Sequence, residues 1–113
     1  MRRTALKARN ERRRASEFAR AYGSEARVMA IKALACYACV KGWPSENAHL
    51  GNGGMGRKAD WTEIVNLCAD CHRELHALGS VERFDAKHGT DLRERARFLA
   101  EYIPASADYE PRR

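Results

Sequence analysis

The pattern of hydrophobic and polar positions along this chain predicts a small α+β fold. Residues 3–35 are rich in Ala, Arg and Glu and contain no Pro, a composition typical of helix. A break at Gly23-Ser24 divides this stretch, and Ser24 is suited to cap a second helix. Short segments near residues 46–50 and 62–66 predict two strands.

The second half of the chain predicts two more helices. One runs from about Cys68 to Leu78, and Gly79 is a fitting C-terminal stop for it. The other covers about 92–102 after a capping Thr-Asp pair, while His88 is assigned to the loop between the two helices. One face of the last helix is apolar and is expected to pack in the core through Leu92, Ala96, Leu99 and Ile103.

Three segments follow from these elements: a basic helical arm over residues 1–23, one core domain over 24–103, and a flexible tail over 104–113. No apolar run has the length needed to cross a bilayer. No signal-type apolar stretch follows Met1, so the expected location is a cytoplasm.

The net charge of +6 is concentrated in the arm. Residues 1–20 hold eight of the 21 Lys and Arg residues but only two of the 15 acidic residues. Such an arm suits a polyanion such as nucleic acid, and the alternative is a solvated helix face. The expected DNA contacts are Arg2, Arg3, Lys7, Arg9, Arg12, Arg13 and Arg14, with Arg57 and Lys58 from a glycine-rich stretch.

All four cysteines lie in two Cys-x-x-Cys pairs. Cys36 and Cys39 form the first pair, and Cys68 and Cys71 form the second. Two such pairs can supply four thiolates to one tetrahedral zinc ion. In a chain with no export signal this spacing favours a metal over disulfides. The sequence therefore predicts a structural zinc site.

The histidines are then left for another role. His72 and His76 lie four residues apart on one face of a predicted helix, where they can share a second metal ion. The alternatives are two solvated surface histidines, or His72 in place of a cysteine on the zinc. His49 lies in a predicted strand, and a histidine that titrates near neutrality can take a proton from water.

Together these residues resemble the HNH endonuclease superfamily, and most closely the small phage and prophage HNH nucleases, a group that includes the recombination-enhancement nucleases. The resemblance covers about residues 24–103. It is carried by Cys36-x-x-Cys39, Ala48-His49-Leu50, the stretch from Gly53 to Trp61, and Leu67-Cys68-x-x-Cys71-His72-Arg73-Glu74-Leu75-His76.

The resemblance implies a ββα-metal core, in which two short strands and a helix hold one catalytic divalent ion, Mg²⁺ or Mn²⁺, braced by the structural zinc. It implies that His49 is the general base and that His72 and His76 bind the catalytic ion. The expected reaction is hydrolysis of DNA phosphodiester bonds, which leaves 5′-phosphate and 3′-hydroxyl ends.

The chain departs from the superfamily pattern at two places. Ala48 stands where many HNH proteins carry an Asp or His that binds the metal. Asp60, Glu63 and Glu46 are the candidates for the missing ligand. The Asn of the motif name has no clear counterpart either, because Glu63 occupies its usual spacing and Asn66 lies nearby.

Two other functions fit part of the sequence. A non-catalytic zinc-ribbon-like DNA-binding module requires the cysteines and the arm but does not require His49. An RNA-binding or RNA-cleaving protein is the third possibility, because contacts to phosphate do not distinguish the sugar.

Overall fold

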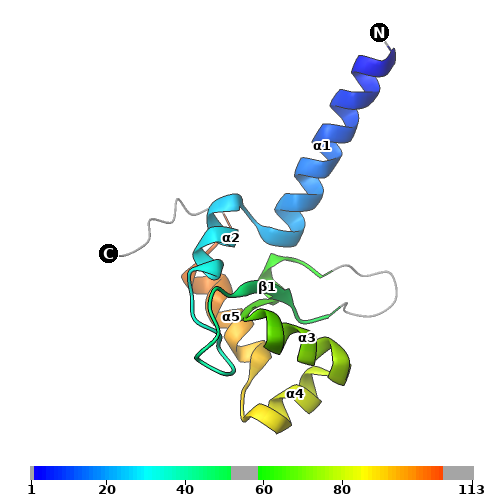
Figure 1. Cartoon of the computed structure of the whole chain (residues 1–113). Coiled ribbons are helices and arrows are strands. Elements are labelled where there is room, and N and C mark those ends of the chain that lie inside the picture. The colour runs from blue at the N-terminus through cyan, green and yellow to red at the C-terminus, as the bar shows by residue number, and fades with distance from the viewer. Residues whose placement is uncertain (1, 52–58, 106–113) are drawn as a thin grey trace.

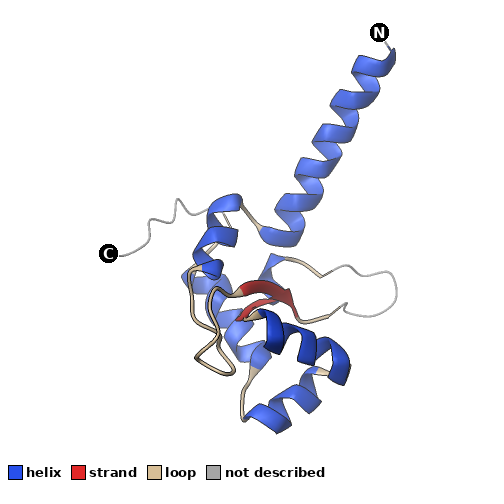
Figure 2. Ribbon diagram, viewed as in Figure 1, coloured by secondary structure: helices blue, strands red, loops and turns tan. Residues whose placement is uncertain are grey.

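The computed structural model describes residues 2–51 and 59–105, and it has a small α+β fold around a two-stranded antiparallel sheet (Figures 1 and 2). Two of the predicted DNA contacts, Arg57 and Lys58, and most of the predicted tail lie outside the described residues. The elements are α1 (Arg2–Tyr22), α2 (Glu25–Lys32), β1 (Glu46–His49), the short 3₁₀ helix η1 (Trp61–Glu63), β2 (Ile64–Leu67), α3 (Ala69–Leu78), α4 (Val81–His88) and α5 (Leu92–Tyr102).

Helix α1 stands away from the rest of the fold and meets it only at its C-terminal end (Figure 1). Residues 5–20 of this helix are exposed throughout. The predicted break is confirmed at Gly23, whose φ of +86° suits glycine. The predicted N-cap is confirmed as well, because the Ser24 side chain accepts a hydrogen bond from the Arg27 backbone N–H.

Successive side chains of each strand point to opposite faces of the sheet. Ala48 lies opposite Val65, and both residues belong to the core cluster on the α3 face. His49 lies opposite Ile64, which packs on the other face with α2 and α5. Strand β2 is buried along its whole length because helices cover both of its faces.

The core therefore has two parts, one on each face of the sheet. The part on the α3 and α4 side contains the larger group of apolar residues, which are Ala48, Val65, Leu67, Leu75, Val81, Phe84, Leu92 and Ala96. The part on the α2 and α5 side contains Ala30, Ile31, Ile64, Leu99 and Ile103. All four residues of the predicted apolar face on α5 are buried, so that prediction is confirmed.

Arg27 is buried in the second part of the core and ties α2 to the end of α5. Its Nε donates to the Ile103 carbonyl oxygen over 2.6 Å, and its guanidinium lies 5.1 Å from the centre of the Trp61 ring. Burial lowers the pKa of Arg27 to about 10, so the side chain keeps its charge at neutral pH.

The predicted helix from about Cys68 to Leu78 is confirmed as α3. It ends at Gly79, which has a φ of +71° and donates its N–H to the Leu75 carbonyl. The loop assigned to His88 is wrong, because His88 is the last residue of α4. This short helix buries only Val81 and Phe84 in the core, and most of its other residues are polar, so its sequence also fits a loop. None of the described helices has the length and apolar character needed to span a membrane.

Candidate metal and catalytic site

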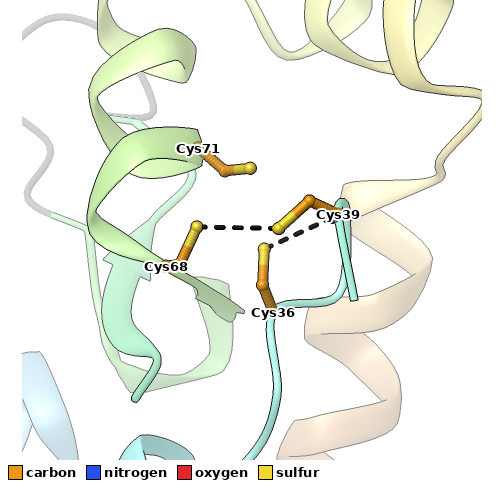
Figure 3. Close-up of side chains that lie close together, drawn as sticks. All are labelled: Cys36, Cys39, Cys68 and Cys71. Carbon is orange, nitrogen blue, oxygen red and sulfur yellow. Dashed lines mark hydrogen bonds between the residues drawn. The ribbon is translucent and has the colours of Figure 1, made fainter. Parts of the chain in front are cut away.

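The fold brings the two cysteine pairs together, and the four side chains point toward one another (Figure 3). The first pair lies in the loop after α2, while Cys68 caps α3 and Cys71 lies in its first turn. The four sulfur atoms lie within 4.8 Å of one another. They can therefore hold a metal ion such as zinc.

One of the sulfur–sulfur distances matches the spacing in a tetrahedral zinc site. Four sulfurs at about 2.3 Å from one ion lie about 3.8 Å apart. The Sγ atoms of Cys39 and Cys68 are separated by 3.8 Å. Cys36, Cys68 and Cys71 are buried, and Cys39 is exposed. All four cysteines are reduced, so the donor set fits a soft divalent cation.

Backbone N–H groups in the first loop are directed at the sulfurs. The Cys39 N–H lies 3.5 Å from the Cys36 sulfur, and the Gly42 N–H lies 3.3 Å from the Cys39 sulfur. Gly42 also leaves room for the second pair, because a Cβ at this position would lie 2.5 Å from the Cys68 sulfur. A residue with any side chain at position 42 would therefore push the two pairs apart.

The pKa values of the thiols show why this cluster calls for a cation. Burial raises the pKa of Cys36, but backbone N–H donors from Cys39 and Cys68 outweigh it and lower the value to about 7. Burial and the neighbouring thiols raise the pKa of Cys71, and burial also raises that of Cys68. The four thiols therefore cannot all ionise in one place without a positive ion to compensate them.

Asn66 of β2 holds the first cysteine pair in position. Its side-chain amide donates to the Ala35 carbonyl over 2.7 Å, and its backbone carbonyl accepts from the Tyr37 N–H over 2.9 Å. Asn66 therefore forms hydrogen bonds with the residues on both sides of Cys36. The Asn66 side-chain oxygen accepts a hydrogen bond from Arg95 of α5. The sequence pattern had singled out Asn66 only as a possible motif residue.

His72 and His76 lie on one face of α3, as their spacing predicts. Their Nε2 atoms are 3.2 Å apart, and the ring centres are 4.9 Å apart. The Nδ1 atom of His72 lies 2.9 Å from a carboxylate oxygen of Glu46 on β1. Both nitrogens of His72 thus already have neighbours other than the cysteines, and the sulfurs cluster without this residue.

His49 lies at the end of β1, on the face of the sheet opposite Ala48. Its Nε2 lies 2.7 Å from the carbonyl oxygen of Ala21, in the last turn of α1. The Tyr22 ring packs against the imidazole, with the ring centres 5.2 Å apart. Because a carbonyl only accepts hydrogen bonds, Nε2 carries the proton and Nδ1 carries the lone pair of the neutral ring.

A cleft of about 730 Å³ lies between the strand histidine and one of the two helix histidines. His49, His76 and Glu63 line it, whereas His72 does not. The α5 side of the cleft carries Arg93 and Arg97 together with acidic groups. Both arginines are paired, since Arg93 contacts Glu82 at 3.0 Å and Arg97 contacts Glu94 at 2.8 Å.

Ala48 offers no metal ligand on the strand next to His49. Its side chain is fully buried beneath α3. The four cysteines are the one group of three or more His, Cys, Asp or Glu residues that converges closely enough for an ion within residues 2–51 and 59–105. Of the three candidate ligands, Glu46 is the one that contacts a helix histidine.

Only some of the basic residues of α1 share one face of the helix, because Lys7 and Arg14 lie on another side. Arg9, Arg13 and Arg20 follow one another at spacings of four and seven residues, and Arg12 lies beside them. The Arg20 guanidinium donates to the Ala59 carbonyl over 2.5 Å, which holds the end of α1 against the core. The other basic side chains from Lys7 to Arg14 are exposed, while Arg2 and Arg3 lie in the first turn.

No protein-family model matches this chain, and no curated protein and no solved structure is significantly similar to it. The assignment of function therefore depends on the arrangement of the residues described above.

Proposed function

We propose that this protein is a metal-dependent endonuclease of the HNH type that hydrolyses phosphodiester bonds in DNA. The observation that carries the proposal is the shared cleft, which is lined by a strand histidine with a free Nδ1 lone pair and by a helix histidine whose Nε2 lies 3.2 Å from a second imidazole nitrogen. The cysteine cluster at the start of the same helix supports this arrangement, because it anchors α3 against the loop after α2.

His49 is the general base in this proposal. The hydrogen bond from Nε2 to the Ala21 carbonyl sets the tautomer and the ring orientation. Nδ1 can then take a proton from a water molecule, and the resulting hydroxide attacks the phosphorus atom. The imidazolium that forms keeps its Nε2 hydrogen bond, so the Ala21 carbonyl stabilises the positive charge that develops on the ring.

His72 and His76 are the residues that would hold the catalytic ion. A divalent cation at this position supplies positive charge to the phosphoryl oxygens and the leaving oxygen. The two imidazoles leave the remaining coordination positions open for water and for substrate, as in other catalytic metal sites. The four Cys side chains would bind the structural zinc and take no part in the reaction.

Helix α1 would supply the affinity for DNA. The helix projects away from the core, and its exposed arginines can neutralise backbone phosphates without reading the bases. The end of the same helix provides the carbonyl that orients His49. The same helix, α1, would therefore both bind DNA and orient the base.

A non-catalytic DNA-binding module is the second candidate function, and the charge of the cleft favours it. Three carboxylates line the cleft but only two arginines do, and a phosphate backbone is repelled by acidic groups. In this alternative the zinc cluster stabilises the fold, and α1 alone contacts the DNA.

Cleavage assays on supercoiled plasmid and on single-stranded DNA separate the two functions. The purified protein is tested with Mg²⁺, Mn²⁺, Zn²⁺ or Ni²⁺, and with EDTA. The nuclease proposal expects metal-dependent cutting that EDTA abolishes and that His49→Ala nearly eliminates. DNA binding without cutting under every metal condition would favour the non-catalytic module, while cutting of RNA alone would assign the site to RNA.

A further inference from the structure

We propose that Glu46 is a positioning residue, which fixes His72 so that His72 and His76 share one divalent ion of the kind that prefers imidazole ligands, such as zinc, nickel or cobalt, over magnesium. The proposal deepens the proposed function at the same histidine pair, and it rests on that pair being a metal site.

The position of Glu46 follows from the strand period. Residues 46 and 48 point to the same face of β1, the face that α3 covers. Ala48 is buried beneath the helix, so no donor group is present at that level. Glu46 lies two residues before Ala48, at the start of β1, where its side chain is half exposed and reaches His72.

The contact between Glu46 and His72 determines which nitrogen of His72 can bind a metal. A carboxylate only accepts hydrogen bonds, so the Nδ1 atom at 2.9 Å carries the proton. The lone pair of the neutral His72 ring is then on Nε2, the atom that faces His76. A carboxylate behind a ligating imidazole also raises the basicity of the ring and stabilises the metal-bound orientation.

The distance between the two Nε2 atoms fits a shared ion. Two imidazole nitrogens about 2.0–2.1 Å from one ion, at an angle of roughly 90–110°, lie about 2.9–3.4 Å apart. The observed separation of 3.2 Å falls within this range. Two nitrogen donors suit zinc, nickel or cobalt, while magnesium prefers an octahedron of oxygens.

The protons of the two rings should respond differently when the ion binds. His72 already has its proton on Nδ1 and its lone pair on Nε2, so its tautomer stays the same. In the metal-free protein His76 donates from Nε2 to the Nε2 lone pair of His72, because only one of the two facing atoms can accept. Binding of an ion to the His76 Nε2 atom therefore requires the one nitrogen-bound proton of this neutral ring to be on Nδ1 instead of Nε2.

The geometry also indicates that Glu46 orients His72 and does not itself bind the ion. No group of three donor atoms that includes Glu46, His72 and His76 converges within the described residues, because the carboxylate lies on the Nδ1 side of the ring. Ala48 supplies no metal ligand, and Glu46 does not take its place as a ligand. Glu46 instead holds the ligand His72 in position.

The test uses the full-length protein with its cysteines loaded with zinc, titrated with Ni²⁺ alone and without DNA. Nickel affinity is measured by calorimetry, the tautomers of the two histidines by ¹⁵N NMR, and retention of zinc by elemental analysis. The variants are Glu46→Ala, Glu46→Gln, which keeps a neutral acceptor, and His76→Ala, which removes one ligand. Asp70→Asn is the matched control, because it removes a carboxylate from the first turn of α3 that pairs with Arg73 and not with His72.

We expect Glu46→Ala to lower the nickel affinity by about 10–100-fold and to release His72 into a mixture of tautomers. Glu46→Gln should lose less affinity, and Asp70→Asn should behave as the wild type. Unchanged nickel affinity in Glu46→Ala would overturn the proposal. Lost affinity with an unchanged His72 tautomer would also overturn it, since Glu46 would then be a ligand.

The outcome is separable from that of the nuclease proposal. Tight nickel binding that depends on Glu46, in a protein that cuts no nucleic acid, would support the positioning role and reject the nuclease. Metal-dependent cutting by a protein whose histidine pair binds no nickel would support the nuclease and reject the positioning role.

Discussion

The cysteine cluster and the histidine pair both lie on α3, but the chain builds them in different ways. The cysteines come from two segments separated by 28 residues, and three of the four are buried. The histidines come from consecutive turns of one helix and stay accessible at the surface, with a cleft beside His76. The first arrangement is closed and suits an ion that stabilises the fold, whereas the second is open and suits an ion that meets a substrate.

Substitutions at the cysteine cluster should therefore affect stability, and substitutions at the histidine pair should affect chemistry. A closed site joins parts of the chain that have little other reason to meet, so its loss should unfold the domain. An open site on one helix can lose a ligand while the helix remains.

Cys68→Ser should give a protein that does not fold, because the cluster loses a ligand at the junction between its two segments. Zinc binding supplies about 10–16 kcal/mol of apparent free energy in small zinc-dependent domains. Elemental analysis and the dispersion of an NMR spectrum measure the result. His72→Ala is the matched comparison on the same helix and should keep both zinc and fold. A well-folded, zinc-free Cys68→Ser protein would remove the distinction between the two sites.

His49→Ala should reduce cleavage by about 10²–10⁴-fold, the usual cost of removing a general base. Zinc content, fold and DNA affinity should stay close to those of the wild type, since the partners of His49 are the Ala21 carbonyl and the Tyr22 ring and not the cysteines or the arginines of α1. Single-turnover cleavage and a binding assay measure the two properties on one preparation. Cleavage at the wild-type rate would show that His49 is not the base.

Gly42→Ala should weaken zinc binding without abolishing folding, because its methyl group would lie 2.5 Å from the Cys68 sulfur and 2.4 Å from the Cys68 Cβ. Overpacking of this kind costs about 1–3 kcal/mol. Competition with a zinc chelator measures the affinity. Gly79→Ala is the control, since that position is open to solvent and the change costs about 1 kcal/mol through its backbone alone. Equal zinc affinity in both variants would show that residue 42 does not limit the approach of the two pairs.

Replacing Arg9, Arg12 and Arg13 with Gln should make DNA binding less dependent on salt while leaving α1 and the His49 contact in place. Each phosphate contact contributes about 0.9 to the slope of log K against log salt, so the slope should fall by about 2–3. Binding measured across a salt series gives the slope. Lys32→Gln combined with Lys41→Gln serves as a control for the loss of surface charge elsewhere. An unchanged slope in the α1 variant would show that the arm does not contact DNA.

Local sequence signals were sufficient for most of the secondary structure. Ser24, Gly79 and Asp91 are caps whose preference depends on their own backbone conformation, and each one marks a helix boundary in the fold. Helix α4 was missed, although Ser80 precedes it and Gly89 follows it, because only Val81 and Phe84 are buried along its length. Its remaining positions resemble those of a polar loop.

The candidate sites show the same distinction between short-range and long-range relations along the chain. Spacing alone placed the cysteines in pairs and the two helix histidines on one face, because both relations hold over a few residues. No short-range pattern indicated that Glu46 meets His72 or that Asn66 grips the chain around Cys36, since these contacts join residues 26 and 31 positions apart. They exist because β1 and β2 pair in one register and α3 packs on one face of that pair.

Local patterns in the sequence were enough to locate most of the helices and both strands, to pair the four thiols, and to separate a basic arm from a neutral core. Those properties depend on side-chain type and on distances of a few residues along the chain. Only the tertiary structure decided that His49 is held by the last turn of the arm, that Ala48 is buried without a donor, and that a carboxylate fixes one of the helix histidines. These relations depend on which faces meet when the sheet is covered on both sides, and that packing is a property of the whole chain.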